Sequence, residues 1–348
     1  MKIAILAPIV ESVPPKMYGG TELVVYNLVE GLKALGHEVT LFASGDSKVS
    51  AKLIPVTKKS VRMAEKIKWP MDFYIYQTLA AEKSLNYILA SDFDIVHSHI
   101  DYYGLHMSRH LKMPFLATFH GRLDLMFMKE YYSLFNGTSG YISISKNQKL
   151  ALPDLNWVGT VYNGIDLDLY PYNANPKGNY LLYFSRINDS KGPVEAIKVA
   201  KKLGKKLIMA SKVDPADEDY YKKIIKPLLS GKDVDYVGEV MHEDKVKLFQ
   251  DAYAYLFPIK WPEPFGLTMV ESLSCGTPVL AFREGSVPEI VKDGYCGYVS
   301  SNVDEMSKHV GEIDKIDREN CRKRASLFSK ERMVKSYVEV YEKSLVLK

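Results

Sequence analysis

The chain begins with a short apolar run, Ile3-Ala4-Ile5-Leu6-Ala7-Pro8-Ile9, followed by Gly19-Gly20 and the stretch Thr21–Leu35. Within that stretch, apolar residues recur on one helical face, at Val24, Leu28, Leu32 and Leu35. Gly36 then stands where a helix commonly ends. A strand, a glycine-containing turn and a helix in this order predict the first βα unit of a parallel sheet. Because the apolar run is short and contains a proline, it favours a buried strand over a secretory leader.

The alternation of apolar strands with amphipathic helices continues along the chain and restarts once. Further strands are expected at Val39–Ala43, Asp94–His99, Pro114–His120 and Tyr141–Ser145. After Tyr170–Asn179, a polar stretch with two prolines that is typical of a linker, strands are expected at Tyr180–Ser185, Lys206–Ala210, Asp235–Val237, Ala254–Pro258 and Pro278–Phe282. Continuously apolar strands are typical of parallel sheets covered on both faces. The fold class is therefore α/β, with two doubly wound, Rossmann-like domains facing each other across a cleft.

Length and composition limit the class of protein. A chain of 348 residues is about twice the size of one ordinary domain. With 47% hydrophobic and 25% charged residues, the composition is that of a globular protein, and a net charge of +4 does not indicate a nucleic-acid partner. Cys275, Cys296 and Cys321 form no CxxC pair, which favours a reducing compartment. No apolar run is long enough to span a bilayer, so we expect a cytoplasmic protein.

Two glutamates bracket a Pro-Phe-Gly sequence in Trp261-Pro262-Glu263-Pro264-Phe265-Gly266-Leu267-Thr268-Met269-Val270-Glu271. Pro264 can start a helix directly after Glu263, and the N–H groups of Phe265, Gly266 and Leu267 would then favour an anion. Glu271 would lie about two turns, roughly 10 Å, further along. A nucleotide-sugar fits this layout, with its sugar at Glu263, its diphosphate at the helix start and its ribose at Glu271. The alternative is that both glutamates are ordinary surface charges.

Two cationic residues follow the first strand of the second domain, in Phe184-Ser185-Arg186-Ile187-Asn188-Asp189-Ser190-Lys191-Gly192. The strand's carboxyl end faces the crevice of a doubly wound sheet, so Arg186 and Lys191 are expected there. A flat guanidinium and a compact ammonium together suit a diphosphate. If negative charge grows on a leaving diphosphate, both cations stabilise the transition state. The alternative is a surface pair on a loop.

The sequence lacks the motifs of several other enzyme classes. It contains no GxxxxGK[ST], GxGxxG or HExxH. Three acidic pairs have a spacing that could hold a metal, namely Asp92 with Asp94, Asp166 with Asp168, and Asp233 with Asp235. Asp94 and Asp235 lead directly into strands and thus lie at the amino end, away from the crevice. We therefore expect structural roles for these pairs, a metal-independent reaction and no cofactor.

Eight short motifs follow one another along nearly the whole chain: Tyr18-Gly19-Gly20-Thr21-Glu22, His97-Ser98-His99, Thr118-Phe119-His120-Gly121, Asn163-Gly164-Ile165-Asp166, Ser185-Arg186 through Lys191-Gly192, Tyr236-Val237-Gly238-Glu239-Val240, Glu263 to Glu271, and Gly285-Ser286-Val287-Pro288-Glu289-Ile290 with Asp293-Gly294. Each motif alone is weak. In this order they resemble the family-4 retaining glycosyltransferases of the GT-B fold.

The resemblance implies roles for individual residues. Arg186 and Lys191 would bind the donor diphosphate, Glu271 the ribose and Glu263 the sugar hydroxyls. Further donor contacts would come from the backbone of Phe265, Gly266 and Leu267, and from the close approach of Gly19 and Gly20. His120 would lie beside the anomeric carbon. For His97 and His99, residues on one face of a strand, a purely structural role is favoured.

The resemblance also implies a separate role for each domain, and it implies a class of substrate. Residues 1–168 would form the acceptor-side domain, residues 169–328 the donor-binding domain, and residues 329–348 a helix packing back across the first domain. The implied reaction moves a hexose from a UDP- or GDP-linked donor to an acceptor with retention at the anomeric carbon. Alternatives are a sugar-nucleotide epimerase or hydrolase on the same fold, and an inactive nucleotide-binding homologue.

The acceptor is left open by the sequence, as a small molecule, a glycan or a lipid-linked sugar. Residues 52–68 contain six basic side chains against Glu65 alone, which is either a solvated face or a peripheral contact with an anionic membrane. The aromatic and methionine side chains of residues 122–136 favour a core helix over an apolar acceptor groove.

Overall fold

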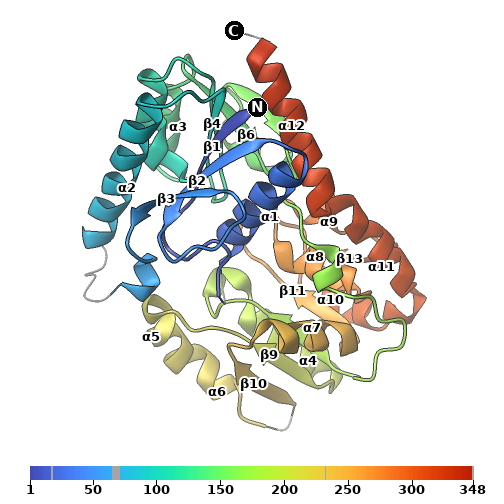
Figure 1. Ribbon diagram of the computed structural model, residues 1–348. Coiled ribbons are helices and arrows are strands. Elements are labelled where there is room, and N and C mark those ends of the chain that lie inside the picture. Colours follow the sequence, from blue (N-terminus) through green and yellow to red (C-terminus); the bar gives the residue numbers. More distant parts are fainter. Residues whose placement is uncertain (17–18, 65–70, 232, 347–348) are drawn as a thin grey trace. The chain divides into compact units, whose positions relative to one another are not determined.

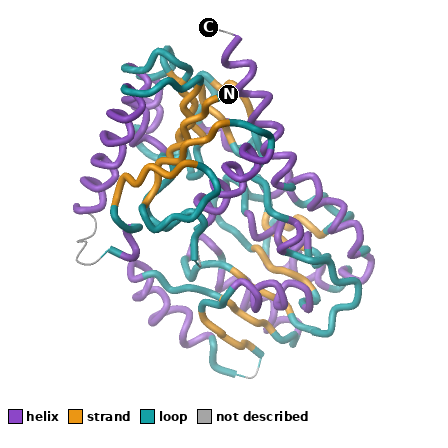
Figure 2. The backbone as a smooth tube through the Cα atoms, in the orientation of Figure 1, coloured by secondary structure: helices purple, strands orange, loops and turns teal. Residues whose placement is uncertain are grey.

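The computed structural model describes residues 1–16, 19–64, 71–231 and 233–346 (Figure 1). These residues form two compact units. The first comprises residues 1–164 together with the chain from Lys330 onward, and the second comprises Ile165–Ser329. In each unit, strands form a central sheet and helices pack around it (Figure 2). Of the motifs and segments above, Tyr18, residues 65–68, Glu65 among them, and residues 347–348 lie outside the described residues.

The first unit is built on a parallel sheet of seven strands in the order β3-β2-β1-β4-β5-β6-β7. The strands are β1 (Lys2–Leu6), β2 (Glu38–Ser44), β3 (Lys52–Thr57), β4 (Ile95–Ser98), β5 (Phe115–Thr118), β6 (Ser139–Ser143) and β7 (Trp157–Thr160). In the centre, Ile3 pairs with Val39 of β2 on one side and with Ile95 of β4 on the other. Because the chain leaves β1 first to one side and later to the other, the sheet has a topological switch point between β1 and β4.

The α-helices of the first unit, within its described residues, are α1 (Gly20–Ala34), α2 (Met71–Leu89), α3 (Met128–Ser133) and α12 (Lys330–Val346). Helix α1 buries Val24, Leu28 and Leu32, as its periodicity predicts. Leu35, which was expected on the same face, lies just beyond the helix and is 58% exposed. Helix α12 packs against α1 so closely that a Cβ on Gly31 would lie 2.4 Å from Cγ2 of Val334. The last helix of the chain therefore belongs to the first unit.

The second unit repeats the plan with six parallel strands in the order β10-β9-β8-β11-β12-β13. The strands are β8 (Leu181–Phe184), β9 (Leu207–Ala210), β10 (Val234–Gly238), β11 (Ala254–Phe257), β12 (Val279–Phe282) and β13 (Gly297–Ser300). The helices are α4 (Pro193–Leu203), α5 (Glu218–Tyr220), α6 (Lys226–Leu228), α7 (His242–Asp251), α8 (Leu267–Ser274), α9 (Val287–Ile290), α10 (Val303–Val310) and α11 (Arg318–Ala325). Its switch point lies between β8 and β11, so ligands are expected beyond the carboxyl ends of these two strands.

The sequence patterns missed three strands, β3, β7 and β13, each of which lies at the edge of its sheet. Edge strands need no continuous apolar pattern, and β3 carries both Lys52 and Pro55. In β13, Gly297 is required because a Cβ there would lie 2.0 Å from the carbonyl oxygen of Val279. A close backbone approach of this kind has no apolar signature in the sequence.

The prediction of a core helix in residues 122–136 was wrong. Only the six residues of α3 are helical there, and Met126 and Phe127 are 81% and 71% exposed. Tyr132 and Phe135 are buried and Met128 is half-buried against the core, so the segment is anchored by these three side chains. Met126, Phe127 and Tyr131 are exposed. The aromatic content was therefore a poor guide to burial.

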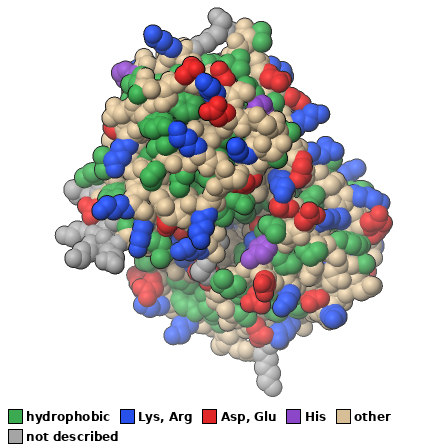
Figure 3. Space-filling view, in the orientation of Figure 1, with side chains coloured by type: hydrophobic (Ala, Val, Ile, Leu, Met, Phe, Trp, Pro, Cys, Tyr) green, Lys and Arg blue, Asp and Glu red, His purple; other side chains and the backbone are tan. Residues whose placement is uncertain are grey.

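Charge on the visible surface is mixed, with Lys and Arg side chains interspersed among Asp and Glu (Figure 3). Two of the three acidic pairs that were expected to be structural have a member in contact with a neighbouring group. Oδ2 of Asp94 accepts the backbone N–H of Lys2 at 2.6 Å, and Asp235 forms an ion pair with Lys206 at 2.7 Å. All three cysteines are free and buried. None of the described helices combines the length and the apolar composition needed to cross a membrane.

Candidate functional site

The switch point of the second unit carries the two predicted cations. Arg186 lies two residues beyond the end of β8, and Lys191 ends a short 3₁₀ turn, Asp189–Lys191, before α4. Gly192 caps α4 with φ 70°, and a Cβ at this position would lie 1.9 Å from the carbonyl oxygen of Pro258, beyond β11. The glycine is thus required for the loop after β8 to lie against the loop after β11, which is the place where a ligand is expected.

Arg186 is held by a carboxylate that sequence reasoning did not single out. Its Nη1 donates to Oδ2 of Asp214 at 3.0 Å, and Oδ1 of Asp214 accepts from Nζ of Lys212 at 2.9 Å. Burial raises the pKa of Asp214, but the hydrogen bonds from Lys212 and Arg186 outweigh it and leave the pKa below its usual value. The ionised Asp214 therefore orients the guanidinium, and two cations share one carboxylate.

Lys191 and Glu263 lie together, as a shared ligand would require. Nζ of Lys191 donates to Oε2 of Glu263 at 2.6 Å, and both side chains are only 13% exposed. The ammonium also lies over the indole ring of Trp261, 4.8 Å from its centroid. Because this pair is largely shielded from solvent, its charges interact more strongly than those of an exposed ion pair.

The backbone of Glu263 is fixed by the loop after β12. The carbonyl oxygen of Glu263 accepts the N–H of Ser286 at 2.9 Å. A Cβ on Gly285, which has φ 54°, would lie 2.3 Å from that same carbonyl oxygen. The motif around Gly285 therefore supports the loop that carries the carboxylate.

Helix α8 begins at Leu267, later than the start at Pro264 that the sequence predicts. Gly266 caps it with φ 80°, a left-handed conformation that glycine adopts without strain. Phe265 is buried with its ring 5.8 Å from that of Phe328, so its side chain belongs to the core. Glu271 consequently lies one turn, not two, beyond the helix start.

Glu271 has one satisfied and one unsatisfied oxygen. The carboxylate is 3% exposed, and its Oε1 accepts from the hydroxyl of Tyr170 at 2.7 Å and from Nζ of Lys245 at 3.0 Å. Burial and the neighbouring carboxylate hold the pKa of Tyr170 well above its usual value, so the phenol remains a donor. Oε2 is buried and accepts no hydrogen bond from any described residue. A buried acceptor left without a donor is costly, which points to a hydroxyl group supplied by a ligand.

At the switch point of the first unit, Gly19 and Gly20 precede and begin α1. A Cβ on Gly19 would lie 2.6 Å from Cβ of Pro15, so the backbone of Gly19 packs closely against Pro15. Glu22, in the first turn of α1, is buried and accepts the N–H of Glu11 at 3.3 Å. Burial raises the pKa of Glu22 to about 7.

His120 lies two residues beyond the carboxyl end of β5 and is half-buried. Its Nε2 is 2.8 Å from Nδ1 of His99, which in turn contacts His97. The sequence patterns placed His97 and His99 on one face of a strand, and this is confirmed by ring centroids 4.1 Å apart. They did not show that His99 holds the ring of His120, because this contact depends on the pairing of β4 with β5.

Two family models match consecutive parts of the chain. Residues 18–169 match the model described as Glycosyltransferase Family 4, and residues 168–328 match the model described as Glycosyl transferases group 1. The chain is a glycosyltransferase of the GT-B type. The first match contains Gly19, Gly20 and His120, and the second contains every predicted donor-binding residue from Arg186 to Glu271.

Individual proteins agree with this assignment. An uncharacterized glycosyltransferase of Methanocaldococcus jannaschii is 26% identical over an alignment of 347 residues, gaps included, that covers 93% of this chain and 94% of that protein. The fold resembles that of the sucrose-phosphate synthase of Thermosynechococcus elongatus, with a TM-score of 0.84, 16% identity and full coverage of both chains. It also resembles the Anabaena protein HepE in complex with UDP and glucose, with a TM-score of 0.77, 19% identity, and coverage of 99% of this chain and 100% of that one.

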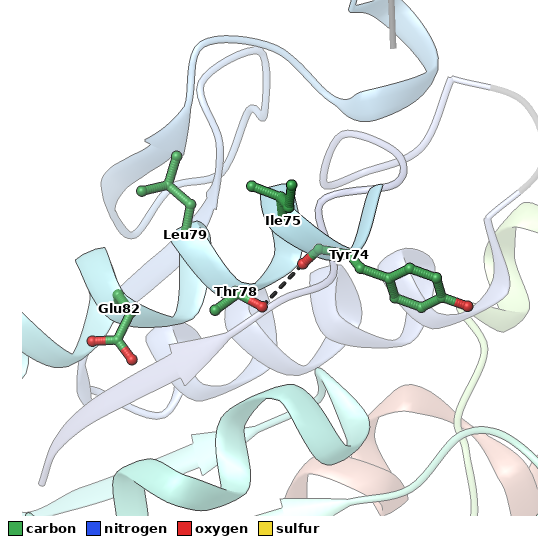
Figure 4. Close-up of a pocket in the computed structure, with 5 residues that line it drawn as sticks. All are labelled: Tyr74, Ile75, Thr78, Leu79 and Glu82. Atoms are coloured by element: carbon green, nitrogen blue, oxygen red, sulfur yellow. Dashed lines mark hydrogen bonds between the residues drawn. The ribbon is translucent and has the colours of Figure 1, made fainter. Parts of the chain in front are cut away.

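A separate apolar surface of the glycosyltransferase lies on α2. Tyr74, Ile75, Thr78, Leu79 and Glu82 line a shallow depression on this one helix, in which the hydroxyl of Thr78 donates to the carbonyl oxygen of Tyr74 at 3.0 Å (Figure 4). The depression includes none of the predicted site residues. Tyr74, Ile75 and Leu79 are 50%, 62% and 45% exposed, so α2 presents an apolar face to solvent.

Proposed function

We propose that this glycosyltransferase moves a hexose from a UDP- or GDP-linked donor to an acceptor hydroxyl, with retention at the anomeric carbon. The observation that carries the proposal is the unsatisfied Oε2 of Glu271, since a ribose hydroxyl of the donor would supply the missing hydrogen bond. The binding of UDP and glucose by the Anabaena structure supports this class of donor.

The cations at the second switch point would bind the diphosphate. In the structure, Lys191 forms an ion pair with Glu263, and Arg186 forms one with Asp214. A diphosphate would take hydrogen bonds from both cations, and the carboxylate of Glu263 would then accept from hydroxyl groups of the sugar. Each opposite-charge contact at about 4 Å contributes at most about 4 kcal/mol at an effective dielectric near 20, before desolvation.

The proposed reaction requires no nucleophile from the protein. The bond from the anomeric carbon to the diphosphate oxygen breaks, and the acceptor oxygen bonds to the same face of that carbon. The acceptor's proton passes to the leaving diphosphate. Arg186 and Lys191 would accelerate this step because the negative charge that they stabilise grows as the bond breaks.

The acceptor side is proposed to include a peripheral membrane contact. Lys52, Lys58 and Lys59 are exposed, and α2 of the same unit presents its apolar face to solvent. Exposed cations and apolar side chains together suit an anionic lipid surface, where a lipid-linked acceptor would reside. Sedimentation with anionic but not with neutral vesicles is expected. Equal recovery with both kinds of vesicle would contradict the contact.

Calorimetry with UDP, GDP and ADP, followed by product analysis with the matching nucleotide-sugars, tests the main proposal. We expect one diphosphate to bind and its sugar to be transferred with unchanged anomeric configuration. A donor converted to its epimer without any acceptor would instead identify an epimerase, and release of free sugar a hydrolase. Binding without turnover on any acceptor tried would identify an inactive homologue.

A further inference from the structure

Three histidine rings of the first unit form one hydrogen-bonded chain at the carboxyl ends of β4 and β5. Nε2 of His99 lies 3.2 Å from Nδ1 of His97, and Nδ1 of His99 lies 2.8 Å from Nε2 of His120. His97 and His99 are 0% and 1% exposed, whereas His120 is half-buried at the outer end. Nδ1 of His120 makes no hydrogen bond with any described residue, so this atom is available to a ligand.

The inner end of the chain is fixed by hydroxyl groups. Nδ1 of His97 is 2.7 Å from the phenol oxygen of Tyr341, and Nε2 of His97 is 2.8 Å from Oγ1 of Thr118. The hydroxyl of Tyr337 lies 3.2 Å from the same Thr118 oxygen. Both tyrosines come from α12 and are fully buried.

All three rings are neutral at ordinary pH. Burial, the largest cause, lowers the pKa of His97 and of His120 to about 3 and that of His99 well below its usual value. Asp101, which is close to the backbone of His120, has its pKa raised to about 6 by burial. A neutral imidazole carries one proton, so each ring has one donor and one acceptor nitrogen.

The two hydroxyls at His97 differ in chemistry, and this difference determines which group donates in each hydrogen bond between the three histidines. A phenol is a better donor and a poorer acceptor than an alkyl hydroxyl, and 2.7 Å is the usual length of a bond donated by O–H. Tyr341 therefore donates to Nδ1 of His97, and Nε2–H of His97 donates to Thr118. Since Nδ1 of His97 carries no proton, a hydrogen bond between it and His99 requires the proton to lie on Nε2 of His99, and this longer bond of 3.2 Å shares the single lone pair of Nδ1 with the phenol at 2.7 Å.

We propose that Tyr341 is a positioning residue that fixes the tautomer of His120 through His97 and His99. Since Nε2 of His99 carries its proton, Nδ1 of His99 is an acceptor and must receive Nε2–H of His120. The free Nδ1 of His120 is then unprotonated and presents a lone pair. This inference rests on the proposed function only in assigning the group that would donate to it, a hydroxyl of the donor sugar or of the acceptor.

The neutral state also limits the chemistry of His120. A ring that takes up a proton only near pH 3 is a weak base, because efficient general bases have pKa values near the working pH. His120 is therefore suited to orienting a hydroxyl by accepting its hydrogen bond. This agrees with a reaction in which the leaving diphosphate takes the proton of the acceptor.

The test is a long-range ¹H–¹⁵N NMR spectrum of the full chain labelled on histidine, without any nucleotide. His120 is assigned from the signal missing in His120→Gln. We expect His120 to carry its proton on Nε2. In Tyr341→Phe, the ratio of tautomers should shift toward Nδ1–H on the order of fivefold, the effect of one ordinary hydrogen bond. Tyr337→Phe, the same change one turn away on α12, removes a hydroxyl that reaches the histidines only through Thr118 and should shift the ratio less.

Two outcomes would overturn the proposal: a wild-type His120 protonated on Nδ1, or an equal shift in both variants. If Tyr341→Phe does not fold, the wild-type spectrum decides alone. Because no donor is present, the result does not depend on transfer activity. If the protein shows the expected tautomer but binds no nucleotide, the proposed function is refuted, whereas the inference about the three histidines is not affected.

Discussion

The ammonium of Lys191 donates to the carboxylate of Glu263 at 2.6 Å, within a largely buried ion pair that belongs to one unit of the molecule. A diphosphate and a hexose would have to separate these two groups and give each a new partner. Removing one member should therefore have a different effect on nucleotide binding from removing the other.

We expect Lys191→Ala to weaken UDP or GDP binding by a factor of 10 or more, the usual effect of losing a charged hydrogen bond, and to affect the bare nucleoside much less. Glu263→Gln should bind the diphosphate at least as tightly as the wild type, because the ammonium no longer has to leave a carboxylate, yet transfer sugar slowly. Calorimetry and initial rates measure the two effects. Equal losses of diphosphate affinity in both variants would contradict the assignment.

The second prediction concerns ribose recognition by Glu271. Glu271→Gln should reduce nucleotide affinity about tenfold and remove most of the preference for UDP over its 2′,3′-dideoxy analogue, because the carboxylate oxygen that accepts the ribose proton is lost. Tyr170→Phe is the matched control, since it removes a donor to Oε1 while Oε2 stays in place. That variant should keep the preference for ribose at a somewhat lower affinity. An unchanged preference in Glu271→Gln would remove the ribose role.

The sequence alone predicts the positions of some of these residues and not of others, and the difference has a physical reason. Arg186 and Lys191 could be placed because they follow directly from a buried strand, and the carboxyl end of a parallel strand has a known location. The contact of Glu271 with Tyr170 spans 101 residues of sequence, and no local pattern marks it. The start of α8 was misplaced because the left-handed conformation of Gly266, not the proline before it, sets where the helix begins.

The third prediction is that transfer proceeds without a divalent cation. Arg186 and Lys191 would neutralise the leaving diphosphate, a task that Mg²⁺ performs in many phosphate-binding enzymes. We therefore expect full activity after exhaustive treatment with EDTA, with the rate measured before and after Mg²⁺ is added back. Loss of activity that Mg²⁺ restores would show that the two cations are not sufficient.

A fourth prediction concerns the packing of α12 on α1. Because a Cβ on Gly31 would lie 2.4 Å from Val334, Gly31→Ala should lower the free energy of unfolding by about 1–3 kcal/mol. Gly137→Ala, in the same unit but with open space around its Cα, should change it far less. Adding Val334→Ala to Gly31→Ala should recover part of the loss. Chemical denaturation measures all four proteins, and no recovery in the double variant would contradict this packing contact.

The fifth prediction follows from the three buried, neutral histidines. Their pKa values are lowered in the folded chain, so between about pH 3 and pH 6.5 the unfolded chain binds more protons than the folded one. The free energy of unfolding should therefore fall as the pH decreases below about 6.5, with a contribution of up to about 1.4 kcal/mol per pH unit from each ring. Glu22 acts in the opposite direction, because its raised pKa of about 7 stabilises the folded chain at lower pH.

Urea denaturation at a series of pH values separates these contributions. His120→Gln should flatten the acid-side slope, because one proton-binding site of the unfolded chain is removed. His110→Gln replaces an exposed histidine of the same unit and should leave the slope unchanged. Glu22→Gln should make the slope steeper, since it removes the opposing contribution between about pH 4.5 and pH 7. A slope that none of the three substitutions alters would show that acid unfolding is controlled by other groups.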